Sequence, residues 1–209
     1  MELTDGELLL RWRQRDFASG EALFERYYKM VERFFLNKIS DAVSDLVQET
    51  FTRCVAGQEH IKDNEQFRLY IFGIAYNVLK EHLRRRYRGE RLLDSCEVSV
   101  RDLEPGPVTL IVRRQEHRLL LEALRSIPID DQVVLELHYW ESLTTEQIAE
   151  ALGLPVGTAR GRLQRARSKL AEAMTQVSDS AQDLTTTLAC VEDWARECRH
   201  HIHQYRRRQ

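Results

Sequence analysis

Basic side chains are the first candidates for chemistry in this 209-residue chain. They crowd into two stretches, Lys80 to Arg91 and Arg160 to Lys169, of a protein whose formal net charge is only −2. Ammonium and guanidinium groups at that density attract phosphate, so two separate stretches indicate two local contacts with a nucleic acid backbone. The alternative is that both stretches are solvated faces of ordinary helices.

A second set of reactive side chains lies in the C-terminal tail. It comprises thiols and imidazoles, the ligands that zinc and copper(I) prefer: Cys190, Cys198, His200, His201 and His203. The tail lacks a CxxC pair, so a zinc or copper site and a plain amphipathic helix with solvated histidines both stay open. Apolar residues at helical spacing from Leu184 to Ile202 predict such a helix. Its apolar face must pack on this protein, on a second copy or on a partner.

Several classes of protein are excluded. The chain has no glycine-rich phosphate loop, nucleophile–base arrangement or pair of carboxylates at acid–base spacing, so we expect no enzymatic activity and no cofactor beyond the tail metal considered above. Four scattered cysteines favour reduced thiols over a disulfide framework. The acidic N-terminus is not a signal peptide, and no window is apolar enough to cross a membrane. We therefore expect a cytoplasmic protein with no membrane association.

The elements that must position these residues are helices. Glycine and proline number only nine and four, and apolar residues recur with the helical period over most of the chain. Pro105, Gly106 and Pro107 cannot continue a helix and mark a linker. We predict an all-α chain with two small helical domains at 1–88 and 112–174, a flexible linker at 89–111 and a helical tail at 175–209.

The second domain has the pattern of a helix-turn-helix. Thr144 and Gln147 fit a capping box, Gly153 suits the left-handed residue of a tight turn, and Pro155 fits the first turn of the next helix. Behind that helix runs an apolar stripe formed by Ala159, Leu163, Ala166 and Leu170. A helix in the major groove needs an apolar back, a base-reading front and cationic edges. The residues predicted to meet DNA are Arg160, Gly161, Gln164, Arg165 and Arg167.

The first domain carries two further signals. In the segment 67–88, aromatic residues stand beside basic ones, a combination that can hold unstacked bases. The alternative is that its apolar residues fill a core, among them Phe67, Ile71, Ile74 and Leu79. In the helix predicted around 45–51, the apolar residues turn inward, namely Leu46, Val47, Phe51 and Val55. This leaves an acidic patch that is unremarkable when taken alone, formed by Asp45, Gln48 and Glu49.

Three segments together carry a resemblance to a known family. DLVQETF, FRLYIFGIAYNVLKEHLRRR and LTTEQIAEALGLPVGTARGRLQRARSKL, in this order, closely resemble RNA polymerase sigma factors of the sigma-70 family, of the extracytoplasmic-function type. The resemblance spans about residues 22–174. It implies a protein that lends promoter recognition to core RNA polymerase and initiates DNA-templated transcription, in a stress or metal response. Core polymerase, promoter DNA and an anti-sigma factor are the implied partners.

The resemblance also implies roles for single residues. Asp45, Gln48 and Glu49 match the helix that docks on the clamp helices of the largest polymerase subunit. Asn77, together with 60–66, would form the pocket for a flipped-out base of the minus-ten element. The strand backbone would be held by Lys80, Arg84, Arg85 and Arg86, and the minus-thirty-five element would be read by Arg160, Gly161, Gln164 and Arg165.

Two positions depart from the family pattern, and one other function stays open. Gly73 stands where the family commonly has a basic residue, and Gly161 is smaller than its frequent serine. The alternative function is a stand-alone helix-turn-helix regulator, which binds duplex DNA without polymerase, usually as a dimer on a palindrome.

Overall fold

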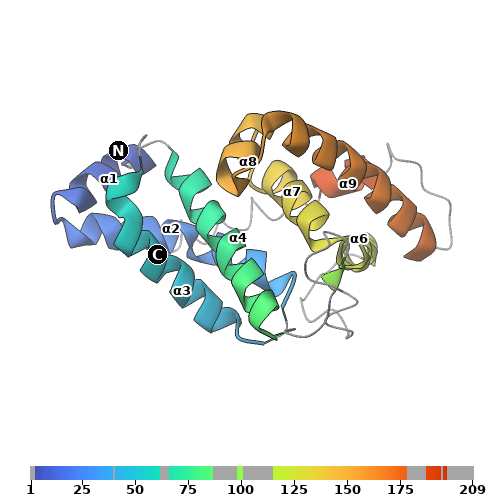
Figure 1. Cartoon of the computed structure of the whole chain (residues 1–209), viewed down its shortest axis with the longest axis horizontal. Helices are drawn as coiled ribbons and strands as arrows, with labels where there is room; N and C mark the ends of the chain where they lie inside the picture. The colour runs from blue at the N-terminus through green and yellow to red at the C-terminus, as the bar shows by residue number, and fades with distance from the viewer. Residues whose placement is uncertain are drawn as a thin grey trace.

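The structure, a computed structural model, describes residues 3–39, 41–61, 66–86, 98–100, 115–177, 187–193 and 195–196. Within these ranges the regular elements are helices, and the extended pairing is an isolated bridge between Ser99 and Pro128 (Figure 1). The predicted all-α fold is confirmed. Among the described helices, none has the length and apolar character needed to cross a membrane.

The first module packs four α-helices around one core (Figure 1). They are α1 (Asp5–Arg13), α2 (Phe17–Leu36), α3 (Val43–Gly57) and α4 (Phe67–Arg86), with a short 3-10 turn, η1 (Gln58–His60), after α3. Leu23, Tyr27, Val31 and Phe35 recur every four residues along α2 and are buried, so one face of this helix forms the centre of the core.

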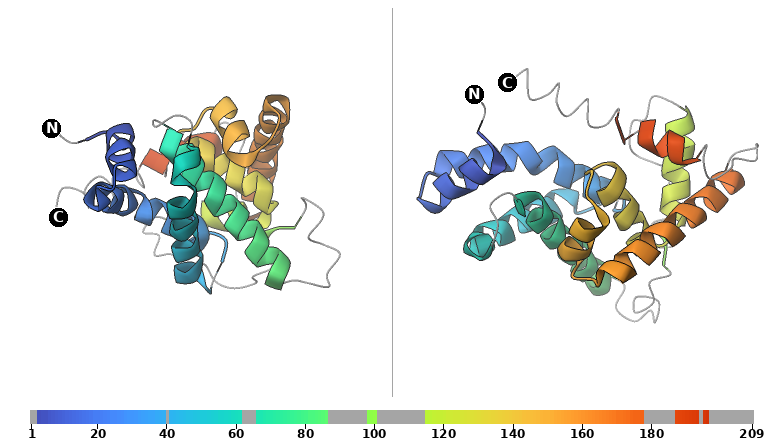
Figure 2. Two further views of the ribbon diagram at one scale, coloured as in Figure 1. Left: turned by 60° about the vertical axis from the view of Figure 1, so that its left-hand side comes forward. Right: turned by 90° about the horizontal axis from the view of Figure 1, so that it is seen from above.

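The second module is built around the long helix α9 (Val156–Val177). The helices α6 (Gln115–Ser126), α7 (Ile129–Tyr139) and α8 (Thr145–Leu152) pack against it (Figures 1 and 2). Apolar residues at helical spacing predict one helix at 119–127 and another at 131–140, and these correspond to α6 and α7. Pro128 ends the turn between them and α7 begins directly after it, because proline lacks the N–H that a helix interior requires.

The two modules touch each other in the structure. α4 packs against α8, and the C-terminal end of α2 meets α7 through hydrogen bonds (Figure 2). Most of the predicted linker lies outside the described residues. Its described part, 98–100, is held by the second module: Val100 is buried, and the Ile129 N–H donates to the Val98 carbonyl at 3.0 Å.

The described part of the tail packs on the second module of its own chain. Residues 187–193 are helical, and Val191 and Ala195 are completely buried in the common core. On the same segment, the Asp193 carboxylate lies 3.7 Å from the ring nitrogen Nε2 of His117 in α6. For these residues, the apolar face predicted from the sequence is therefore satisfied within the chain.

Candidate nucleic-acid and polymerase interfaces

The turn between α8 and α9 has the local geometry that its sequence predicts. The Thr144 hydroxyl accepts from the Gln147 N–H at 3.3 Å, while the Gln147 side chain accepts from the Thr144 N–H at 2.9 Å. Gly153 ends α8 at φ 64°, ψ 37°, the left-handed region that glycine enters without steric cost. Pro155 then leads directly into α9. The helix-turn-helix is confirmed.

The long helix α9 presents a polar front on an apolar back. The back is buried in the module core and consists of Ala159, Leu163, Ala166 and Leu170. On the front, Arg160, Gln164 and Arg165 are exposed, and the Arg160 side chain is 70% exposed although its guanidinium lies 3.3 Å from Glu146. Gly161 between them is half-buried. This helix can therefore offer three long polar side chains to a groove at once.

The cations beside this front are already engaged with α7. The Arg167 guanidinium donates to the Tyr139 hydroxyl at 3.0 Å and lies 5.6 Å from the centre of that ring. Arg162 bonds to Asp130 at 3.0 Å, and Lys169 bonds to Asp131 at 2.7 Å. In this conformation these three residues brace α9 against α7, and Arg167, which the sequence predicts to meet DNA, is engaged within the protein.

In α4 the structure separates core aromatics from exposed polar groups. Phe67, Phe72 and Tyr76 are buried, so these three of the aromatic side chains considered for base stacking belong to the core, whereas Tyr70 is half-buried and Tyr87 lies outside the described residues. Asn77 is exposed, and the Lys80 ammonium lies 5.1 Å from the centre of the Tyr76 ring. The helix ends in three exposed arginines, Arg84, Arg85 and Arg86, the last of which pairs with Asp41. Residues 62–65 of the predicted base pocket lie outside the described residues.

The acidic patch on α3 is partly organised by an arginine. Asp45 and Gln48 are exposed, whereas the half-buried Glu49 carboxylate lies 2.8 Å from Arg53. Arg53 also makes two bonds, of 2.8 and 2.7 Å, to the Glu81 carboxylate of α4. Hydrogen bonding to Arg53 lowers the pKa of Glu81, so this carboxylate stays ionised to a lower pH than an ordinary glutamate does. One arginine thus connects the patch with α4.

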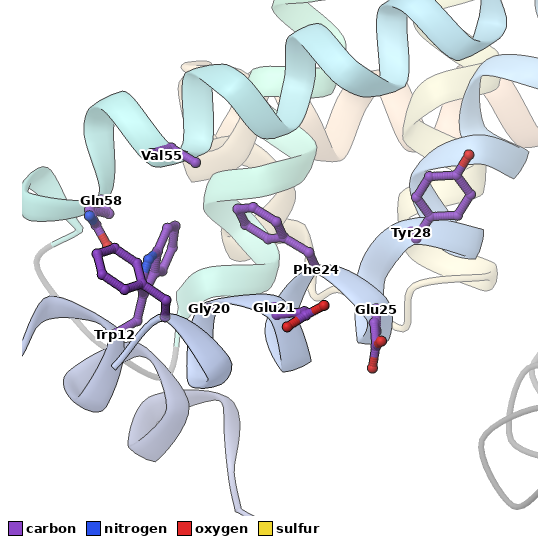
Figure 3. A pocket seen from close by; sticks show the side chains of 9 residues that line it. Trp12, Gly20, Glu21, Phe24, Glu25, Tyr28, Val55 and Gln58 are labelled. Carbon is purple, nitrogen blue, oxygen red and sulfur yellow. The ribbon is translucent and has the colours of Figure 1, made fainter. Parts of the chain in front are cut away.

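A groove that the sequence did not predict lies on the same module (Figure 3). It measures about 460 Å³ and runs along α2 between Trp12 of α1 and Val55 of α3. Val55, predicted to face inward, is 46% exposed at its wall, and Phe17 is 75% exposed. An exposed aromatic directly after the Asp16 cap of α2 is the sequence signal that could have indicated this surface.

The predicted metal ligands do not form a described cluster. Only Cys190 of the five lies within the described residues, where it is half-buried; Cys198, His200, His201 and His203 lie outside them. Among the described residues, no group of three or more histidine, cysteine, aspartate or glutamate side chains is arranged to hold a metal ion.

Comparisons with known proteins agree with this geometry. The family model described as Sigma-70 region 2 matches residues 23–89, and the model described as Sigma-70, region 4 matches residues 117–170. The chain is 28% identical over 179 residues to the ECF RNA polymerase sigma-E factor of Haemophilus influenzae, covering 81% of this chain and 94% of that protein. The Escherichia coli K12 protein of the same name is 26% identical, with 81% and 93% covered.

Two solved structures share the fold. CnrH in complex with the cytosolic domain of CnrY aligns with a TM-score of 0.60 at 21% identity, covering 84% of this chain and 99% of CnrH. The sigma factor RpoE of Bartonella quintana, solved with the anti-sigma factor NepR, aligns with a TM-score of 0.57 at 23% identity, covering 77% and 98%.

The two family models match in their expected order and together cover more than half of the chain. They fall on the two helical modules, and the second one contains the helix-turn-helix. The chain therefore belongs to the sigma-70 family, as an extracytoplasmic-function sigma factor: a transcription initiation factor that directs core RNA polymerase to promoters and is not itself an enzyme.

Proposed function

We propose that the two modules divide promoter recognition between them. Residues 1–88 bind polymerase and open the minus-ten element, residues 112–174 read the minus-thirty-five element, residues 89–111 connect them, and 175–209 form an appendage. The observation that carries this division is the position of the exposed polar side chains. Arg160, Gln164 and Arg165 line the front of α9, while Asn77 and the basic end of α4 face solvent on the other module.

The polymerase contact is proposed for the patch of Asp45, Gln48 and Glu49. Two of these side chains are exposed, and Glu49 is oriented by its ion pair with Arg53. A polar, solvated patch of this kind is better suited to a transient contact with a charged partner helix than to an obligate apolar interface.

Strand opening is proposed for α4. Asn77 offers an exposed amide to an extruded base, while the phosphates are left to Lys80, Arg84, Arg85 and Arg86. Because Phe67, Phe72 and Tyr76 are buried here, amide and backbone contacts account for this proposal better than a row of stacking rings.

Duplex reading is proposed for the front of α9. Arg160 and Arg165 can donate to a guanine edge and Gln164 can pair with an adenine edge, each for about 1–3 kcal/mol of discrimination. Gly161 between them lets the helix approach the bases closely. Arg167 would have to exchange its bond with Tyr139 for a phosphate.

Regulation and location are proposed more broadly. Partnership with core polymerase and promoter DNA implies the cytoplasm, and a stress or metal response is proposed from the resemblance to the extracytoplasmic-function type alone. An anti-sigma factor is a proposed partner because one related structure contains one. Zinc or copper binding by the tail rests on its ligand types alone. Titrating each metal into the wild type and a Cys190→Ser, Cys198→Ser variant tests it, and equal weak uptake by both rejects it.

The decisive experiment reconstitutes transcription from purified core polymerase and a randomised promoter library. Arg160→Ala and Gln164→Ala should relax the preferred bases of the minus-thirty-five element. Their matched controls, Arg118→Ala on α6 and Gln176→Ala near the end of α9, also remove exposed side chains of the same types and should leave promoter choice unchanged. A protein that binds a palindrome tightly without polymerase would be a stand-alone regulator instead.

A further inference from the structure

An arginine of α1 bonds to the backbone at the point where the chain leaves α3. The Arg13 guanidinium donates to the Gln58 carbonyl from Nε at 3.2 Å and from Nη2 at 2.7 Å, and Nη2 also donates to the Ile61 carbonyl at 2.6 Å. Arg13 lies before the match to Sigma-70 region 2, which begins at residue 23. A side chain outside the matched region therefore holds the turn η1 from its first residue to the residue that follows it.

The chemistry of a helix end explains why an arginine fits this position. The last carbonyl groups of a helix have no N–H partner within the helix and carry partial negative charge. α3 ends at Gly57, and the Ile61 N–H reaches the Gln58 carbonyl only at 3.4 Å. The forked and permanently charged guanidinium of Arg13 supplies closer donors to two carbonyls at once.

The neighbouring tryptophan fixes the place from which this guanidinium acts. Trp12 is buried, and its ring meets the Phe24 ring edge-on with 5.2 Å between their centres. A Cβ atom built on Gly20 of α2 would lie 2.7 Å from the Trp12 indole, so the backbone of α2 lies directly against that ring. Trp12 and Gln58 line the same end of the groove (Figure 3). α1 is thus held on α2 in a fixed position, with Arg13 directed at the end of α3.

The same stretch of backbone is fixed on its other side by α4. A Cβ atom built on Gly57 would overlap the Tyr70 hydroxyl, so this tyrosine lies directly against the end of α3. Tyr70 and Asn77 are seven positions apart, which is about two helical turns, and so they lie on the same side of α4. Ile61 is buried in the core. Residues 57–61 are therefore held between α1 and the side of α4 that carries Asn77.

A base that leaves the stack gains most from a pocket that is already formed. Groups that must first be ordered around a ligand reduce its affinity by the entropy that they lose. The proposed pocket consists of Asn77 and the segment 60–66, which continues directly from η1. The position of that segment relative to Asn77 depends on where the chain leaves η1, and Arg13 determines this point.

We propose that Arg13 is a positioning residue for strand opening. By bonding to the carbonyls of Gln58 and Ile61, it fixes the start of the segment 60–66 relative to Asn77 and so prepares the pocket before a base enters it. Arg13 acts through this backbone and does not touch the base. The inference rests on the proposed role of Asn77 and 60–66 in opening the minus-ten element.

Binding of the minus-ten strand by the complete holoenzyme tests the inference. The holoenzyme is assembled from core polymerase and the full chain, and its affinity is measured for the intact single strand and for strands made abasic at one position in turn. The wild type should favour the intact strand over the strand that lacks the extruded base. Arg13→Ala should reduce this preference roughly tenfold, with little change in affinity for the abasic strand, because only an occupied pocket needs its walls in place.

Two further variants separate positioning from charge and from general stability. Arg11→Ala removes an exposed arginine from the same helix and should behave like wild type. Arg13→Lys keeps the charge without the planar fork and should retain a preference between those of wild type and Arg13→Ala. Circular dichroism verifies folding and the binding of core polymerase verifies assembly. If Arg13→Ala does not fold, Arg13→Lys alone is compared with wild type.

The outcomes distinguish this inference from the function on which it rests. A wild-type preference in both Arg13 variants, or an equal loss of affinity for intact and abasic strands, overturns the positioning role. Loss of the preference in Asn77→Ala but not in Arg13→Ala rejects the inference and leaves the proposed pocket standing. A wild type that binds intact and abasic strands equally at every position rejects the proposed pocket, and the inference with it.

Discussion

The ammonium of Lys38 is 2.5 Å from the carboxylate of Glu136, and this pair joins the turn after α2 to α7 although the two residues are 98 positions apart in the sequence. The ammonium also donates to the Phe34 carbonyl at 2.8 Å and lies 4.0 Å from the centre of the Phe34 ring. Removing one partner of a buried ion pair strands a charge in a medium of low polarity, which costs about 3–5 kcal/mol, whereas replacing both partners with apolar residues is often neutral.

A double-mutant cycle on this pair should therefore be strongly non-additive. Lys38→Met should lower the free energy of unfolding by about 3–5 kcal/mol, and Lys38→Met combined with Glu136→Met should recover most of that loss. Urea denaturation measures both. Equal losses from the single and double variants would show that the pair is not coupled.

Substituting Gly153 should destabilise the helix-turn-helix through the backbone alone. Its φ of 64° costs a residue with a Cβ about 1–2 kcal/mol, while no atom lies within 4 Å of the added carbon. Gly153→Ala should lower the free energy of unfolding of the second module by that amount, which thermal denaturation measures. Gly157→Ala, in helical geometry and equally open space, should be neutral or stabilising by about 0.5–1 kcal/mol. Similar losses from both would remove the backbone explanation.

Cys54 should be unreactive in the folded protein and should make stability depend on pH. Burial raises the pKa of its thiol from the ordinary 9.0 to about 12. Between these values the unfolded chain loses a proton that the folded chain retains, so stability is fully present below pH 9 and falls by about 1.4 kcal/mol per pH unit above it. Relative to Cys54→Ala, wild type should lose stability as the pH rises from 9 to 11. Fast labelling by a thiol reagent at neutral pH would contradict this burial.

Docking of the tail should contribute to the stability of the second module. Val191 is completely buried against that module, and burying a side chain of this size contributes about 1.5–3 kcal/mol. Val191→Ser should lower the midpoint of urea denaturation, whereas Glu192→Ala, at the exposed neighbouring position, should leave it nearly unchanged. An unaltered midpoint for Val191→Ser would mean that the tail does not pack on the module in solution.

Local patterns predicted the helix-turn-helix because every signal in it acts within a few residues. The Thr144–Gln147 capping box, the Gly153 turn and the apolar stripe of α9 depend on neighbouring backbone and on helical period, and all were found as predicted. The helix predicted at 131–140 begins two residues later and ends one residue later than α7 does in the structure. Differences of this size are typical of helix ends, which fray.

Long-range contacts explain what the sequence could not supply. Tyr76 lies in a segment whose aromatic and basic residues suggest base stacking. In the structure it is instead buried, and its hydroxyl donates to Asp130, more than fifty positions later. The sequence shows that Gly73 departs from the family pattern. The contact that leaves no room for a side chain at this position is with the Ala151 carbonyl, which belongs to the other module. Val55 follows the inward period of α3 and yet faces the groove beside Phe24, where its side chain stays 46% exposed.

Arg53 joins Glu49 of α3 to Glu81 of α4 through bonds of 2.8 and 2.7 Å. Exposed ion pairs of this kind add little to stability, and their value lies in alignment. The forked guanidinium sets how far α3 and α4 can slide or rotate past each other, and Glu81 is one helical turn beyond Asn77. The surface proposed to meet the polymerase and the surface proposed to meet the separated strand are therefore tied together through the side chain of Arg53.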